Sequence, residues 1–184
     1  MTSHRFFIAL LPPQTIQQRV NEIKQHFADV YQSRKAFKSP PHITLQPPFH
    51  WEDANISVLE YTLAEFARNR GSIPILLSGF GAFKPRVIFV NPLKTPELMK
   101  IQEDLGNYLA RTLSIVDEKS KFRSFSPHIT VAFQDLTSQN FKKAWPEFEK
   151  REFQFEFTIS ELTLLIYEDR KWEIAREFPL EGLN

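Results

Sequence analysis

The sequence contains no cysteine and only five glycines among its 184 residues. The absence of cysteine excludes disulfide scaffolds, zinc sites with thiolate ligands and cysteine nucleophiles. It is compatible with a reducing compartment, and we expect a cytoplasmic protein. The sequence also has no Gly-rich loop of the P-loop or dinucleotide-binding type, so a reaction step driven by ATP has no visible site.

Long hydrophobic runs and an excess of charge of one sign are missing as well. The apolar run Phe6 to Leu11 is shorter than the hydrophobic region of a signal peptide, and no run reaches the roughly 18 apolar residues of a membrane span. Lysine plus arginine (23) nearly balance aspartate plus glutamate (22), which leaves a net charge of +1. Binding to duplex DNA or to a membrane is therefore not expected. We expect a soluble monomer whose anionic partner is small or is met locally.

Apolar residues are abundant, at 42% of the chain, and they include 18 phenylalanines. This content is enough for a packed core, and the length suits one domain over residues 1–184. Apolar spacing of three and four residues predicts helices over residues 14–28, 55–70, 95–113 and 137–150. Extended segments are predicted over residues 5–11, 42–45, 73–83, 87–90, 125–133, 153–160, 162–167 and 172–180.

The order strand, helix, extended segment with a histidine, helix and strand occurs twice along the chain. This repetition indicates a degenerate internal duplication, with two unrelated segments and a chance match as the alternative. The two halves share Pro41-His42-Ile43-Thr44 and Pro127-His128-Ile129-Thr130. On an extended strand, residues i and i+2 point to the same face, so each histidine has a threonine hydroxyl beside it.

Two such strands brought together would line one cleft with two imidazoles and two hydroxyls. Displacement at a phosphodiester needs a base for the entering oxygen and an acid for the departing one, and imidazole can do either near neutral pH. The hydroxyls of Thr44 and Thr130 can donate to the phosphate oxygens that gain charge. A single His-x-Thr is more often a packing feature, but two copies with the same flanking residues favour a functional pair.

These motifs resemble the signature of the two-histidine (2H) phosphoesterases, which include bacterial 2′-5′ RNA ligase-like proteins and RNA 2′,3′-cyclic phosphodiesterases. The resemblance covers nearly the whole chain. It implies that His42 and His128 are the catalytic acid and base, that Thr44 and Thr130 bind phosphate, and that no cofactor or metal is required. The first motif continues as Gln46-Pro47-Pro48-Phe49, where the ligase-like branch usually has an apolar Phe-Leu-Gly segment, so the resemblance places the chain in the superfamily more securely than in that branch.

The resemblance also implies an α+β fold with two lobes, in which two strand-helix-strand units related by a pseudo-twofold axis place antiparallel sheets around a central cleft. We expect the lobes to cover roughly residues 1–84 and 85–184, with the terminal strands exchanged between them. The expected function is hydrolysis of 2′,3′-cyclic phosphate or 2′-5′-linked nucleotide or RNA ends. A module that binds such ends without cleaving them is the alternative.

Further candidates for substrate binding follow from residues near the two motifs. Basic side chains precede both motifs, and of these Lys38 and Arg123 are the candidates that could attract phosphate, with solvated loop charges as the alternative. Phe49 and Phe125 could stack on a base, although core packing is the other interpretation of both, and Tyr167 could edge the site. A metal site built from the two histidines is disfavoured, because neither motif has an acidic residue at ligand spacing.

Overall fold

The computed structural model describes residues 1–182, which form eight strands, four α-helices and three short 3-10 helices. The strands are β1 (Ser3–Leu10), β2 (Ile43–Glu52), β3 (Ile73–Phe83), β4 (Val87–Pro92), β5 (Ile129–Ala132), β6 (Gln154–Ile159), β7 (Glu161–Glu168) and β8 (Lys171–Pro179). The helices are α1 (Gln14–Tyr31), α2 (Ile56–Arg68), α3 (Pro96–Leu113) and α4 (Ser138–Phe148). The 3-10 helices are η1 (Lys35–Lys38), η2 (Asp53–Asn55) and η3 (Glu118–Lys121).

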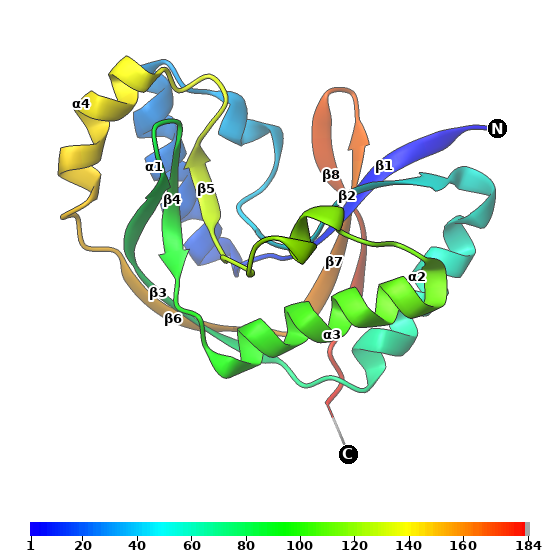
Figure 1. Ribbon diagram of the computed structural model, residues 1–184. Coiled ribbons are helices and arrows are strands. Elements are labelled where there is room, and N and C mark those ends of the chain that lie inside the picture. The colour runs from blue at the N-terminus through cyan, green and yellow to red at the C-terminus, as the bar shows by residue number, and fades with distance from the viewer. Residues whose placement is uncertain (183–184) are drawn as a thin grey trace.

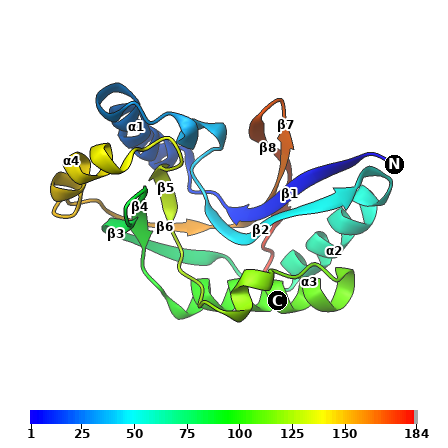
Figure 2. The same cartoon turned by 45° about the horizontal axis from the view of Figure 1, so that its top comes forward.

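The strands form two four-stranded antiparallel sheets, in the orders β2-β1-β7-β8 and β5-β4-β3-β6. Helices α2 and α3 pack on the first sheet through β8 and β2, whereas α1 and α4 pack on the second through β5 and β4 (Figure 1). Turning the molecule shows the same separation of the two sheets, with α2 and α3 on one side and α1 and α4 on the other (Figure 2). The predicted α+β fold with antiparallel sheets is confirmed.

Sheet membership does not follow the order of the two halves of the sequence. Strands β7 and β8 come from the end of the chain, yet β7 pairs with β1 along Phe6 to Ala9. Conversely, β3 from the first half pairs with both β4 and β6 in the second sheet. A single apolar core includes residues of both sheets, such as Ile8 and Ile88.

From Phe6 to Leu10, strand β1 is buried on both faces, which explains the unbroken apolar run in this part of the strand. Phe6, Ile8 and Leu10 point into the main core. Phe7 and Ala9 point the other way and form a second small cluster with Leu165, against which Trp172 packs. This second face of the first sheet is the one on which the first motif lies, because Thr44 pairs directly with Ala9 across β1 and β2.

The first motif strand is longer than its pattern indicates. Residues 42–45 were the expected strand, but β2 runs on through Pro47 and Pro48 to Glu52. Proline cannot donate to a sheet ladder, and β2 tolerates it because it lies at the edge of its sheet. The expected end of the strand at residue 45 is therefore wrong.

Each motif histidine lies one residue before its strand rather than within it. Strand β2 begins at Ile43 and β5 begins at Ile129, so His42 and His128 directly precede them. The prediction of a strand that includes His42 is corrected by one residue. Within residues 1–182, none of the helices is long and apolar enough to cross a lipid bilayer.

Candidate active site

The two histidines occupy equivalent places in the two sheets. His42 precedes β2, the first strand in the order of its sheet, and His128 precedes β5, the first strand in the order of the other. The following residues, Ile43 and Ile129, are fully buried in the core, whereas Thr44 and Thr130 are partly exposed. Because successive side chains of a strand point to opposite faces, the isoleucine of each motif is buried in the core and the threonine hydroxyl stays accessible.

Each imidazole is held by a carbonyl oxygen two residues earlier. The Nδ1 atom of His42 lies 2.7 Å from the Pro40 carbonyl oxygen, and that of His128 lies 2.8 Å from the Ser126 carbonyl oxygen. A carbonyl oxygen can only accept a hydrogen bond, so Nδ1 carries the proton in both rings. In the neutral form each Nε2 then has a free lone pair, which is the state required of a general base.

Aromatic rings fix the other sides of the imidazoles. The ring of Phe7 lies 4.8 Å from that of His42, centroid to centroid. The rings of Phe83 and Phe89 lie 5.1 and 5.5 Å from that of His128. Since Phe7 comes from β1 and the other two from β3 and β4, each histidine is held by the sheet that carries it.

The surroundings of both histidines favour the uncharged imidazole. Burial lowers the pKa of His42 to about 4, and the positive charges of Lys24 and His128 act in the same direction. Burial also lowers the pKa of His128, with a further contribution from Arg123. Both rings are therefore mostly neutral at pH 7 when no anion is bound.

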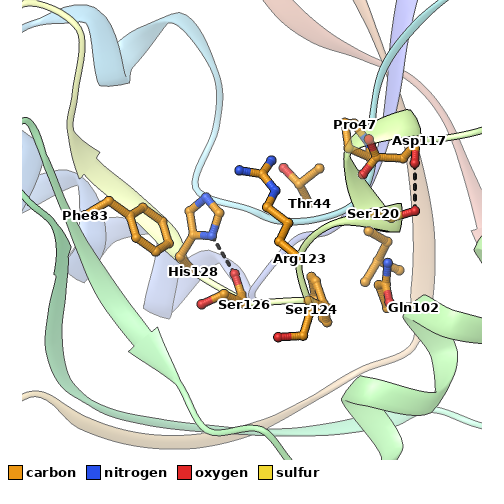
Figure 3. Close-up of a pocket in the computed structure, with 12 residues that line it drawn as sticks. Thr44, Pro47, Phe83, Gln102, Asp117, Ser120, Arg123, Ser124, Ser126 and His128 are labelled. Carbon is orange, nitrogen blue, oxygen red and sulfur yellow. Dashed lines mark hydrogen bonds between the residues drawn. The ribbon is translucent and has the colours of Figure 1, made fainter.

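A cavity of about 200 Å³ lies beside His128 and is reached by both motifs. Its lining includes Thr44 from the first motif and His128 from the second, but neither His42 nor Thr130. The guanidinium of Arg123 reaches toward the space between His128 and Thr44, and Phe83 lies on the far side of the imidazole (Figure 3). The other lining residues are Leu45, Pro47, Gln102, Asp117, Ser120, Ser124, Phe125 and Ser126.

The remaining candidates from the sequence lie at different distances from this cavity. Phe125 and Arg123 line it. Phe49 packs against Phe6 and the main core, so the core interpretation describes its place in the structure. Tyr167 lies against Trp172 at the β7–β8 hairpin. Lys38 ends η1, four residues before His42, and is not among the residues that line the cavity.

Several residues near the motifs were not singled out in the sequence. Lys24 is 1% exposed although it is charged, and it lies on the apolar face of α1 next to Ile23. A lysine within the apolar stripe of a helix was the available signal for it. Ser124 and Ser126 line the cavity but have no pattern that distinguishes them from ordinary loop serines. Among the described residues, no three His, Asp or Glu side chains lie close enough together to hold a metal ion.

Gly81 of β3 leaves room for the ring of Phe89 beside His128. The two residues are cross-strand partners, and a Cβ atom on Gly81 would lie 2.4 Å from the Phe89 ring. Such a contact is far too short, so the ring must move, and it packs against the imidazole. Gly81 is therefore a steric requirement for the present position of Phe89.

We expect Gly81→Ala to destabilise the protein by about 1–3 kcal/mol, as overpacked sites do. It should also change the NMR shifts and the pKa of His128 without changing those of His42. The matched control is Gly106→Ala in the interior of α3, where a Cβ meets nothing within 4 Å, and it should stabilise the protein by about 0.5–1 kcal/mol. Equal stability of Gly81→Ala and wild type in urea unfolding would contradict the steric argument.

Sequence and structure comparisons agree with this arrangement. Residues 12–171 match the family model described as the 2′-5′ RNA ligase superfamily, so the chain belongs to that superfamily. A relative from Geobacillus sp. (strain WCH70), which carries the provisional name of phosphoesterase, is 28% identical over 97% of both chains. The predicted membership among the 2H phosphoesterases is confirmed.

Solved structures show the same fold at low sequence identity. TT0787 of Thermus thermophilus superposes with a TM-score of 0.71 at 18% identity, covering 98% of this chain and all of that one. LigT of Escherichia coli in complex with 3′-AMP gives a TM-score of 0.66 at 18% identity, covering 97% of this chain and 99% of LigT. A further LigT structure is in complex with phosphate and gives a TM-score of 0.62 at 18% identity, covering 98% of this chain and 99% of LigT.

Proposed function

We propose that this protein is a phosphodiesterase that opens 2′,3′-cyclic phosphates, or cleaves 2′-5′ linkages, at the ends of nucleotides or RNA. The observation that carries the proposal is the matched pair of imidazoles, each with Nδ1–H bonded to a backbone carbonyl and Nε2 left free. Hydrolysis of a phosphodiester needs one group that removes a proton from water and one that donates a proton to the leaving oxygen, and the two imidazoles can fill both roles. Binding alone needs only cations and hydroxyls, and gives no reason for two oriented imidazoles.

In the proposed reaction, one histidine takes a proton from water as the water oxygen attacks phosphorus. The bond from phosphorus to the 2′ or 3′ oxygen breaks, and the other histidine gives its proton to that oxygen. The product of a cyclic phosphate is a phosphate monoester, and each histidine ends with the protonation state of the other. The pair supplies both proton transfers, so the reaction does not require a metal.

The groups around the cavity suit a phosphate in this reaction. Thr44 lines the cavity and can donate a hydroxyl hydrogen bond to a non-bridging oxygen, and Arg123 can balance the charge on these oxygens. Thr130 has the equivalent place in the second motif but does not line the cavity, so its hydroxyl can donate only to a phosphate that lies between the two motifs. The cavity beside Thr44 and His128, about 200 Å³ in volume, is small and matches a compact ligand. The LigT complexes with 3′-AMP and with phosphate support a nucleotide phosphate as the class of ligand for this fold.

The test is incubation of the purified protein with a panel of 2′,3′-cyclic nucleotides and 2′-5′ dinucleotides, with 3′-5′ dinucleotides as the control for linkage. Each reaction is run with and without EDTA, and products are separated by chromatography. We expect monoester products in both conditions. Tight binding without product across the panel would support the non-catalytic module instead, and loss of turnover with EDTA would refute a reaction without metal.

A further inference from the structure

The most unusual charged group outside the two motifs is Lys24 of α1. Its side chain is 1% exposed, and its ammonium donates hydrogen bonds of 2.9 Å to the carbonyl oxygens of Ala36 and Ser39. Buried lysines are rare unless they are paired, and the partners here are carbonyl groups rather than a carboxylate. The amino group is therefore held inside the protein by two carbonyl oxygens, without a neutralising anion among these partners.

The two carbonyls belong to the segment between α1 and β2, residues 32–42, which is called the turn below and which ends at His42. Ala36 lies in η1, and Ser39 directly precedes Pro40, whose own carbonyl accepts the hydrogen bond from His42 Nδ1. Proline has a restricted φ, so Pro40 and Pro41 leave the backbone between Ser39 and His42 little conformational freedom. The position of Ser39 therefore constrains the position of His42. Lys24 thus fixes the peptide beside the one that orients the imidazole.

The opposite end of the same turn is anchored from the loop after β5. The carboxylate of Asp135, three residues after β5, accepts hydrogen bonds from the Ser33 hydroxyl at 2.8 Å and from the backbone N–H groups of Arg34 and Lys35 at 2.7 and 3.0 Å. The turn is therefore held at both ends, and only the Lys24 end carries a buried positive charge toward His42.

No comparable buried cation acts on His128 among the described residues. The cation that lowers its pKa is Arg123, whose side chain is exposed and therefore screened by solvent. The charged or titratable groups that act on His42 are Lys24 on α1 and His128. Phe7 on β1 is neutral, and η1 carries Lys35 and Lys38. The two imidazoles are alike in geometry and differ in their electrostatic surroundings.

We infer that Lys24 is a positioning residue that orients His42 and adds to the burial that disfavours its charged form, so that His42 is the better suited of the two imidazoles to act as the base. The assignment of acid and base rests on the proposed function, whereas the effect of Lys24 on His42 does not. A buried cation acts through a low dielectric, so its influence on a neighbouring imidazole is larger than that of a surface charge. It disfavours the imidazolium, and only the neutral ring can accept a proton from water.

The pH range in which this effect operates follows from the two groups. Burial lowers the pKa of Lys24 to about 7, so the ammonium is fully charged where His42, with a pKa of about 4, takes up its proton. Removing the charge of Lys24 should therefore raise the pKa of His42. If His42 is the base, the acidic limb of kcat/KM against pH should move to higher pH by the same amount, while the other limb stays.

The experiment compares Lys24→Met and Lys24→Gln with wild type, and uses Lys142→Met on the exposed surface of α4 as the control for loss of one lysine. The glutamine variant keeps an N–H donor for the carbonyls and loses the charge, and it remains available if Lys24→Met does not fold. The imidazole proton signals of His42 are titrated by NMR in the protein without substrate. We expect its pKa to rise by roughly half a unit to one unit in each Lys24 variant.

An unchanged His42 pKa in a folded Lys24 variant, or a shift no larger than in Lys142→Met, would overturn the inference. So would a uniform fall in kcat at all pH values with both limbs of the profile in place, since that is the result of a purely structural role. The NMR titration needs no substrate. Failure of the protein to cleave any phosphodiester would therefore refute the proposed function while leaving the effect of Lys24 measurable.

Discussion

Replacing His42 or His128 by asparagine is expected to lower kcat by about 10²–10⁴-fold for each substitution, the usual contribution of general acid or base catalysis. Asparagine keeps an N–H that can bond to the carbonyl of Pro40 or Ser126, but it cannot exchange a proton near neutral pH. The measurement is steady-state kinetics on the best substrate of the panel. The double variant should be little worse than the poorer single variant, because the two groups act in one step.

His50→Asn is the matched control for this loss. His50 lies on β2 like the first motif, is exposed, and is followed two residues later by Glu52 rather than by a threonine. Its substitution should leave kcat near the wild-type value. A variant at His42 or His128 that unfolds like wild type and retains full turnover would show that the two imidazoles are not the acid and base.

The sequence predicts the local elements well because their patterns are local. The helix over residues 95–113 is marked by Pro96 at its first position and by apolar residues at helical spacing, and in the structure Thr95 caps it by accepting a hydrogen bond from the Leu98 N–H. The two Pro-His-Ile-Thr motifs likewise predict, from their own residues, an extended backbone and a shared face for the histidine and the threonine. What these patterns leave open is which strands become neighbours.

Pairing of β7 with β1 joins residues more than 150 positions apart, and it depends on the complementarity of two apolar faces rather than on any short motif. The passage of β2 through Pro47 and Pro48 depends on its place at the edge of the sheet, which only the assembled sheet defines. Phe49 near the first motif could not be assigned to core or site for the same reason.

The electrostatics of the site were the least predictable part. The motif residues identify two imidazoles with the same neighbours, which suggests equivalent groups. The inferred difference between them involves Lys24, 18 positions before His42, because the turn after α1 folds back over its amino group. A lysine in an apolar stripe indicates an irregularity, but the partner that it meets is set by tertiary packing.

Removal of the hydroxyl groups of the motifs is expected to give the second large effect. Thr44→Val and Thr130→Val preserve the branched shape of each side chain and delete only the donor to the phosphate oxygens. Loss of one such donor in a preorganised site lowers kcat by about 10²–10³-fold, because the charge on those oxygens is greatest in the transition state. The fall should appear in kcat more than in KM.

The serine variants Thr44→Ser and Thr130→Ser are the controls, since they keep the hydroxyl and lose one methyl group. They should retain most of the activity that the valine variants lose. Thr44 lines the cavity directly, whereas Thr130 pairs with Phe89 on β4 and is not among the lining residues. If valine at Thr130 is harmless while valine at Thr44 is not, the phosphate is held by one motif only, and the symmetric arrangement of donors must be abandoned even though the histidines remain paired.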